Sequence, residues 1–213
     1  MSLMSKLASQ CSKPSGWLGR FSLWTMNLRH SKVTDWGLSH VSIGKHNTIL
    51  DVGCGGGRTV HTLAAMAPEG RVYGIDHSEE SVAVAQRTNK LWIEMGRAEI
   101  RQGSVSHLPF PDGMFDLATA VETHFWWPDL AADMREVFRV LKPGGKLVII
   151  AEVYKGGRGG KYDKRIQKAA QWTNMAFLSV NEHRELFSTA GYSDVRMIES
   201  EKGWICGVGS KPS

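Results

Sequence analysis

The stretch Asp51-Val52-Gly53-Cys54-Gly55-Gly56-Gly57 decides the fold, because it joins a predicted strand to a predicted helix. The apolar, β-branched run Ile49–Gly53 has the length of a buried strand, and Arg58–Met66 has helical character. Glycines between them let the backbone turn tightly and approach a ligand. The start of the following helix offers free backbone N–H groups. The sequence therefore predicts a ligand site at this turn.

Two acidic residues narrow the choice of ligand. Asp51, just before the glycines, would repel a phosphate but suits a ligand with an ammonium or sulfonium charge. Asp76 ends the next predicted strand, where a carboxylate can accept hydrogen bonds from both ribose hydroxyls. No Gly-Lys-Ser/Thr follows, so the turn is not a P-loop. A nicotinamide dinucleotide site is the alternative, but its third glycine would come one residue later.

The pattern outward from this turn alternates strands with helices. Further strands are expected at 71–76, 99–103, 115–121 and 146–153, with helices at 78–95, 130–141, 162–177 and 181–190. This order predicts an α/β fold with a mostly parallel sheet and helices on both faces. The last strands, 193–199 and 203–209, are joined by a link too short for a crossover, so they should form an antiparallel hairpin.

Length and composition fit one domain. The 213 residues are 42% hydrophobic and 22% charged, which is ordinary for a globular protein. We expect residues 1–45 to form a helical arm and residues 46–213 the main domain. The net charge of +5 favours an anionic partner only slightly.

Cysteine usage and the absence of long apolar runs bear on location. The three cysteines form no CxxC pair, so no metal site and no disulfide framework is predicted. No signal peptide and no run of about 18 apolar residues is present, so no membrane span is expected and the predicted location is cytoplasmic.

Several motifs taken together resemble class I S-adenosylmethionine-dependent methyltransferases. They are DVGCGGG at 51–57, Asp76 at a strand end, Phe115-Asp116-Leu117, and the run LKPGGKL at 141–147. The resemblance spans about residues 46–153 and is nearest to the type 11 methyltransferases, which are similar to the quinone-biosynthesis C-methyltransferases. It implies a Rossmann-like seven-stranded sheet, S-adenosyl-L-methionine as cofactor and S-adenosyl-L-homocysteine as product.

The resemblance also implies cofactor contacts at matching positions. The glycine loop would pass under the methionine part, Asp51 would lie near its ammonium, Asp76 would hold the ribose, and His77 would flank the adenine. Many family members carry an acid at the position of Ser104, next to the expected adenine edge. The full expected set is Asp51, Gly53, Cys54, Gly55, Gly57, Asp76, His77, Gly103, Ser104, Val105, Val121 and Glu122. Cys54 is expected to serve for packing rather than as a nucleophile.

Methyl transfer is an in-line displacement at a sulfonium methyl, so the protein must position the acceptor, exclude water and, where needed, take a proton. The candidates for the proton are Glu122, His124 and Glu152, near the carboxyl ends of the fourth and fifth strands, where ligands bind in such sheets. A histidine has a suitable pKa near pH 7. His124 could instead only shape the loop, and Glu152 could be a loop partner.

Aromatic residues are the candidates for contacting the substrate: Trp17, Trp126, Trp127 and Tyr154. Trp126 and Trp127 could form an apolar wall or face the sulfonium, or could simply pack a helix on the sheet. The basic, glycine-rich segment 155–161 could act as a lid or could be a solvated loop.

Three classes of function compete. A small-molecule methyltransferase is favoured. A nucleic-acid methyltransferase is disfavoured, because Glu122-Thr123-His124 replaces both the (D/N)PPY segment and the Pro-Cys nucleophile that base methyltransferases carry after the fourth strand. A protein that binds the cofactor without turnover is the third, since methyl transfer needs no fixed catalytic residue. The sequence leaves the oligomeric state, monomer or homodimer, open.

Overall fold

The computed structural model describes residues 31–157 and 175–213. Their seven strands form one sheet, in the order β3-β2-β1-β4-β5-β7-β6. The strands are β1 (Thr48–Val52), β2 (Arg71–Asp76), β3 (Ala98–Gln102), β4 (Phe115–Val121), β5 (Leu141–Ala151), β6 (Ser193–Glu199) and β7 (Ile205–Ser210). The helices are α3 (Ser31–Leu38), α4 (Arg58–Met66), α5 (Glu79–Thr88), α6 (Lys90–Glu94), α7 (Leu130–Val140) and α9 (Val180–Thr189), with a 3-10 turn, η1, at His124–Trp126.

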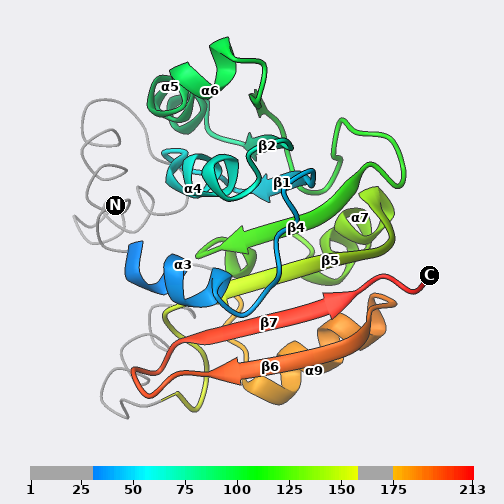
Figure 1. Ribbon diagram of the computed structural model, residues 1–213. Coiled ribbons are helices and arrows are strands. Elements are labelled where there is room, and N and C mark those ends of the chain that lie inside the picture. The colour runs from blue at the N-terminus through cyan, green and yellow to red at the C-terminus, as the bar shows by residue number, and fades with distance from the viewer. Residues whose placement is uncertain (1–30, 158–174) are drawn as a thin grey trace.

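The sheet is parallel except at β7, which runs antiparallel to both β5 and β6. The predicted seven-stranded sheet with its terminal hairpin is thereby confirmed. The chain winds outward from β1 to β3 and then returns to place β4 on the other side of β1 (Figure 1). Ligands in open α/β sheets bind at the carboxyl ends of the strands where the winding reverses, here β1 and β4.

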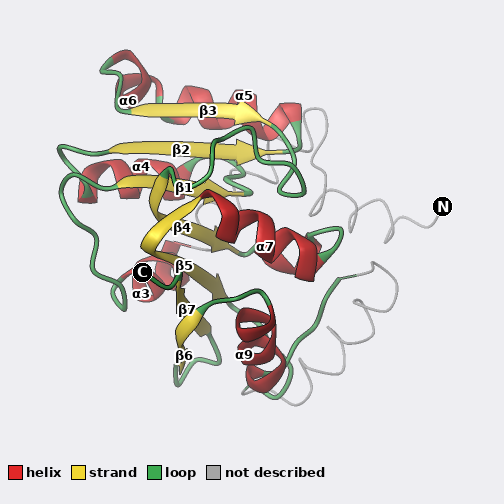
Figure 2. Ribbon diagram, turned by 90° about the vertical axis from the view of Figure 1, so that its right-hand side faces the viewer, coloured by secondary structure: helices red, strands yellow, loops and turns green. Residues whose placement is uncertain are grey.

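Helices cover both faces of the sheet (Figure 2). On one face, α3, α4 and α5 bury Val33, Leu63 and Val82 in a single hydrophobic cluster with residues of the sheet. On the other face, α7 and α9 bury Met134 and Phe187 in a second cluster. Because α3 is part of the first cluster, this piece of the N-terminal arm packs directly on the sheet.

The helix expected over 78–95 and the start of the fifth strand differ most from the sequence-based expectation. The single helix expected over 78–95 is wrong, because the chain breaks at Asn89 into α5 and α6. The buried Asn89 amide donates to the carbonyl oxygens of Gly57, at 2.8 Å, and of Ala85, at 2.9 Å, so this residue leaves the helical pattern to tie α5 to the glycine loop. Strand β5 starts at Leu141 rather than Lys146, with a register shift opposite Phe115–Leu117. Most of the helix expected over 162–177 lies outside the described residues.

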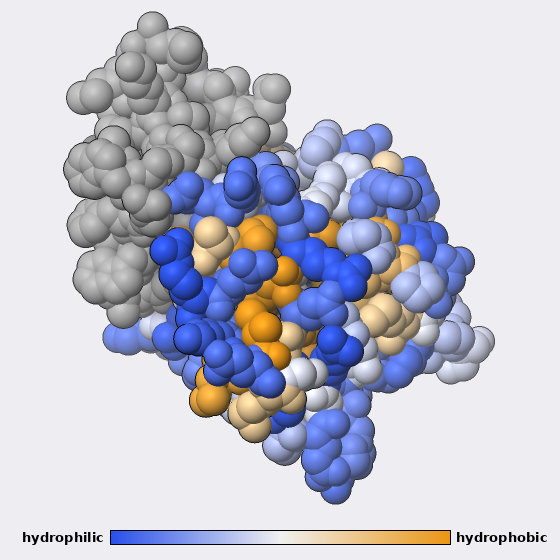
Figure 3. Space-filling model, turned by 90° about the horizontal axis from the view of Figure 1, so that it is seen from above, coloured by the Kyte–Doolittle hydropathy of each residue, from blue (hydrophilic) through white to orange (hydrophobic). Residues whose placement is uncertain are grey.

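The surface at the β3 end of the sheet is mainly hydrophilic, with a strip of hydrophobic residues running through it (Figure 3). Over all described residues, the large apolar side chains that are exposed are Met66, Leu91 and Met95. Within the same residues, no helix combines the length and the apolar character needed to cross a bilayer.

Candidate functional site

The glycine loop turns from β1 into α4 with three residues in the left-handed region. Gly53, Gly55 and Gly57 have φ values of 71°, 50° and 79°. The backbone N–H groups of Gly53 and Cys54 both donate to the carbonyl oxygen of Ile75 in β2, at 2.8 and 3.0 Å. The loop is therefore fixed to the neighbouring strand in a conformation that only glycine adopts readily.

At two of these glycines, close neighbours also leave no room for a side chain. A Cβ on Gly53 would lie 2.1 Å from Oγ1 of Thr123, which follows β4. A Cβ on Gly57 would lie 2.8 Å from the Cα atom of Ala85 in α5. The first contact brings the segment after β4 onto the loop, and the second lets α4 and α5 meet closely. Thr123 is not in the set of cofactor contacts expected from the sequence, because its side-chain contact is visible only in the fold.

Asp76 is held by backbone donors on both sides. Its Oδ2 accepts from the N–H of Gly55 at 2.9 Å, and its Oδ1 accepts from the N–H of Ser78, the N-cap residue of α5, at 2.9 Å. The exposed His77 ring lies beside it, with Nδ1 3.7 Å from Oδ1. The carboxylate is thus oriented between the glycine loop and the start of α5, at the end of β2.

Asp51 is a buried carboxyl group with one neutral partner. Oγ1 of Thr119 in β4 donates to its Oδ1 at 2.7 Å. Burial, and secondarily the negative charge of Asp76, raise the pKa of Asp51 from 3.8 to about 7. A cationic group placed here would be attracted by the ionised form. Thr119 is directly opposite Asp51 in the parallel pairing of β1 with β4, so that register could have revealed it.

The Cys54 side chain packs in the hydrophobic cluster on the α3–α5 face of the sheet. Its side chain is buried, and a Cβ on Gly74 would lie 3.1 Å from its Sγ atom. Burial raises the pKa of the Cys54 thiol well above its ordinary value, which disfavours the thiolate. These observations agree with the expected packing role of the side chain.

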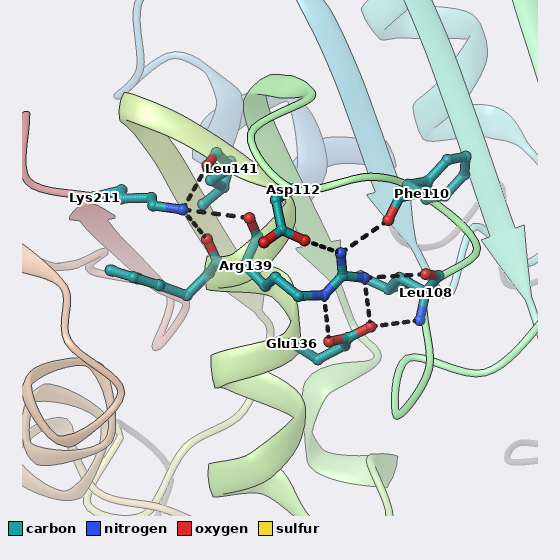
Figure 4. A network of polar contacts seen from close by, with 8 residues as sticks. Leu108, Phe110, Asp112, Glu136, Arg139, Leu141 and Lys211 are labelled. Carbon is teal, nitrogen blue, oxygen red and sulfur yellow. Dashed lines mark hydrogen bonds and ion pairs between the residues drawn. The ribbon is translucent and has the colours of Figure 1, made fainter.

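The loop after β3 contains the residues expected at the adenine edge. The N–H of Gly103 donates to the carbonyl oxygen of Asp76 at 2.9 Å, Ser104 is exposed, and Val105 belongs to the core. Figure 4 shows how Arg139 of α7 clamps this loop. Its guanidinium donates to the carbonyl oxygens of Leu108 and Phe110 and to the carboxylates of Asp112 and Glu136. No motif in the sequence marks Arg139.

Lys211 closes the end of α7 in the same network. Its Nζ donates to the carbonyl oxygens of Phe138, Arg139 and Leu141, at 2.9, 3.3 and 2.8 Å (Figure 4). A cation here satisfies the carbonyls that the helix leaves unpaired at its carboxyl end. The C-terminal segment therefore braces the helix that holds the loop after β3.

The carboxyl ends of β4 and β5 are joined through Glu122. The Glu122 backbone has a φ of 55°, and its N–H donates to the carbonyl oxygen of Ile150 at 2.9 Å. The Glu122 carboxylate accepts from the backbone N–H of Glu152. Both acidic residues are partly buried. The structure thus brings Glu122 and Glu152 together, with one Glu122 oxygen engaged by the neighbouring backbone.

His124, in η1, is almost fully buried and faces a second histidine. Its Nε2 lies 3.0 Å from Nε2 of His183 in α9. Burial, and then the nearby His183, lower the pKa of His124 well below its ordinary value. Burial also lowers the pKa of His183. His183 is 59 residues away in the chain, and nothing in the sequence pattern indicates the pair.

The aromatic candidates fall in different places. Trp126 is partly buried and packs against a small cluster that also holds Phe125 and Tyr154. Tyr154 is itself buried, and its hydroxyl donates to Glu199 of β6 at 2.5 Å. Trp127 belongs to the main core beneath α7, which favours packing over ligand contact. Trp17 lies outside the described residues.

The fold and the site together define a class of protein. A glycine loop from β1 into α4, a backbone-held acid at the end of β2, and the order β3-β2-β1-β4-β5-β7-β6 with β7 antiparallel are the framework of class I S-adenosylmethionine-dependent methyltransferases. Residues 50–149 match the family model described as "Methyltransferase domain".

Individual relatives agree with this class. Demethylmenaquinone methyltransferase from Listeria welshimeri is 30% identical over 181 residues, which cover 76% of each chain. The chloroplastic 2-methyl-6-phytyl-1,4-hydroquinone methyltransferase of Arabidopsis thaliana is 29% identical over 185 residues, covering 87% of this chain and 50% of that protein. A crystal structure of an S-adenosylmethionine-dependent methyltransferase from Aquifex aeolicus has the same fold, with a TM-score of 0.73, 22% identity, and coverage of 89% and 96%.

The chain belongs to the class I S-adenosylmethionine-dependent methyltransferases of this methyltransferase-domain family. Its cofactor is S-adenosylmethionine. The residues of the site fit that molecule: a buried carboxyl group at Asp51 suits an ammonium, and a backbone-held carboxylate at Asp76 suits a ribose.

Proposed function

We propose that this enzyme methylates a small molecule whose reacting part is an electron-rich aromatic ring of the hydroquinone type. The small-molecule acceptor is supported by the segment after β4, which carries no base-methylating motif. In its place stand Glu122, the paired His124, and the aromatic residues Phe125 and Trp126. The two relatives above are named for quinone and hydroquinone methylation. We take residues 46–213 as the domain that carries the reaction and residues 1–45 as an arm added to it.

The cofactor would be held by residues at the ends of β1, β2, β3 and β4. Asp51 would bind the ammonium, Asp76 the ribose hydroxyls, and His77 and the Gly103–Val105 segment the adenine. The loop of Gly53, Cys54, Gly55 and Gly57, with Val121 and Glu122 beside it, would follow the methionine part. When bound, the cofactor supplies a methyl group on a positively charged sulfur, which leaves as a neutral thioether.

The chain's own residues would then exclude water and take up the proton released by the acceptor. Trp126 and Tyr154 lie in one cluster near the ends of β4 and β5, where they would form an apolar wall. Trp17 is proposed as a further contact from the arm. Glu122, His124 and Glu152 are the candidates for the proton, because all three lie just beyond the carboxyl ends of these two strands. General-base help of this kind contributes about 10²- to 10⁴-fold to a rate.

The test is a transfer assay with methyl-labelled cofactor and a panel of acceptors. The panel contains short-chain demethylmenaquinol, its oxidised quinone, simple phenols, tRNA and duplex DNA, each at two salt concentrations. We expect label on the hydroquinone and none on the nucleic acids. Asp194→Asn, a change at an exposed acid in β6, serves as the matched control for Asp76→Asn, which should abolish transfer.

Other outcomes would point elsewhere. Label on tRNA that falls steeply with salt would favour a nucleic-acid methyltransferase, because phosphate contacts are salt-dependent. Cofactor binding without transfer to any acceptor, or slow hydrolysis, would favour a protein that binds the cofactor without turnover. Label on a phenol but not on a hydroquinone would keep the small-molecule assignment and overturn the proposed acceptor class.

A further inference from the structure

The buried His124–His183 pair has a defined arrangement of protons. His183 is in the first turn of α9, and its Nδ1 lies 2.8 Å from the carbonyl oxygen of Ser179, the N-cap residue. A carbonyl oxygen only accepts, so Nδ1 of His183 must carry a proton. Ser179 is held by a capping box with Glu182, which also pairs with Lys155. The acceptor that fixes this proton is therefore well anchored.

Burial keeps both rings of the pair neutral. His124 is 1% exposed and His183 2% exposed, and burial disfavours the charged form of each ring. A neutral His183 with its proton on Nδ1 has a lone pair on Nε2. Nε2 of His124 lies 3.0 Å from that atom, so it must donate. His124 is then the tautomer with its proton on Nε2 and a lone pair on Nδ1.

That lone pair is unsatisfied in the part of the chain that the structure describes. Nδ1 of His124 is buried and has no hydrogen-bond partner there. Buried polar atoms are nearly always paired, so an acceptor left without a donor is consistent with a catalytic role, in which a ligand brings the partner. Residues 31–157 and 175–213 contain no group of three side chains that could hold a metal ion beside this nitrogen.

The position of His124 connects it to the cofactor loop. The preceding residue, Thr123, has its side chain directly against Gly53. The N–H of Trp127 donates to the His124 carbonyl oxygen at 3.1 Å, which closes the η1 turn and fixes the backbone that carries the ring. The ring is thus placed at the carboxyl end of β4, one residue from a contact with the glycine loop.

We propose that His183 is a positioning residue that holds His124 in the Nε2-protonated tautomer, so that Nδ1 of His124 accepts the proton released by the methyl acceptor. This inference rests on the proposed function. An electron pair of the methyl acceptor forms the new bond to the methyl carbon, and the electron pair of the broken carbon–sulfur bond stays on sulfur. The acceptor's proton moves to Nδ1, and the resulting imidazolium still donates through Nε2 to His183.

The first test reads the tautomer without any turnover. Nitrogen-15 spectra of the full chain, labelled at histidine, distinguish protonated from bare ring nitrogens, and His124→Asn assigns the signals. We expect a bare Nδ1 and a protonated Nε2 at His124. His183→Gln, which keeps an acceptor for the Nε2 proton, should preserve this pattern, and His183→Leu should convert it to a mixture. His46→Gln, at an exposed ring, is the matched control and should change nothing.

A protonated Nδ1 at His124, or a pattern that His183→Leu leaves unaltered, would overturn the proposal. The second test uses the acceptor found in the transfer assay. His183→Leu should lower kcat by about 10²-fold, with the acceptor KM and the affinity for S-adenosylhomocysteine changed by less than about threefold, and His183→Gln should recover most of the rate. A purely structural role would instead weaken cofactor binding and kcat together. If the unaltered protein methylates nothing, the proposed function fails, and the nitrogen-15 spectra still decide whether His183 sets the tautomer.

Discussion

Replacing Gly53 with alanine tests the geometry of the glycine loop most sharply. The residue has a φ of 71°, and the new Cβ would lie 2.1 Å from Oγ1 and 2.8 Å from Cβ of Thr123. Holding a non-glycine residue in the left-handed region costs about 1–2 kcal/mol. Overpacking against a stiff, β-branched side chain adds about 1–3 kcal/mol. We therefore expect Gly53→Ala to lower the free energy of unfolding by about 2–5 kcal/mol.

The matched control is Gly113→Ala. Gly113 has a φ of 63°, and a Cβ there meets nothing within 4 Å, so only the backbone cost applies. Urea unfolding without ligand should show a loss of about 1–2 kcal/mol for this variant. In a Thr123→Gly background, Gly53→Ala should approach the same value, because both clashing atoms are gone. Equal losses for Gly53→Ala and Gly113→Ala in the parent protein would refute the claim that Thr123 packs on the loop.

Three further predictions follow from the polar groups of the site. Because the pKa of Asp51 is raised from 3.8 to about 7, the stability that this group contributes is full below its unfolded pKa and is lost as the pH rises through about 7. In urea unfolding, the free energy of unfolding of Asp51→Asn should therefore fall less between about pH 5 and 8 than that of the parent. Parallel plots of the free energy of unfolding against pH for the two proteins would contradict this. Affinity for S-adenosylhomocysteine should rise over the same interval as Asp51 ionises, and calorimetric titration of Asp51→Asn should show no such rise. Arg139→Lys keeps the charge, but a lysine cannot make all five hydrogen bonds of the arginine. It should therefore lower the free energy of unfolding by about 2–3 kcal/mol and weaken the binding of adenosine-containing ligands. An unchanged urea midpoint would refute the role of Arg139 in holding the loop.

The frame of the fold could be predicted because its signals are local. Ile49–Gly53 is an apolar run that leads into the glycine turn, and Arg71–Asp76 is one that ends in an acid. Both strands, and the positions of Asp51 and Asp76 near their ends, therefore follow from the pattern. The link at 200–202 was too short for anything but a hairpin, which the pairing of β6 with β7 confirms. Asn89 shows the limit, because a polar residue in a helical pattern looks like surface until Gly57 is brought against it.

The site was less predictable because its side-chain partners come from distant segments. Thr119 is 68 residues from Asp51, and His183 is 59 residues from His124. Neither belongs to a motif, and only the packing of β4 on β1 and of α9 near η1 brings them together. Trp126 and Trp127 are adjacent in sequence, yet Trp126 packs on the small cluster beyond β4 and β5 and Trp127 lies in the main core. The two side chains separate because η1 ends at Trp126 and the backbone of Trp127 is extended.

Calorimetric titration of the purified protein with S-adenosylmethionine, S-adenosylhomocysteine and NADH, alongside Asp76→Ala, tests the central claim most directly. Asp76 connects the glycine loop to α5 and ends β2, so it is the residue on which the proposed ribose contact depends. The two adenosyl ligands should bind, NADH should not, and the variant should lose binding while retaining a cooperative thermal transition. Binding of NADH, or binding of S-adenosylhomocysteine to Asp76→Ala as tightly as to the parent, would contradict the assignment of this loop.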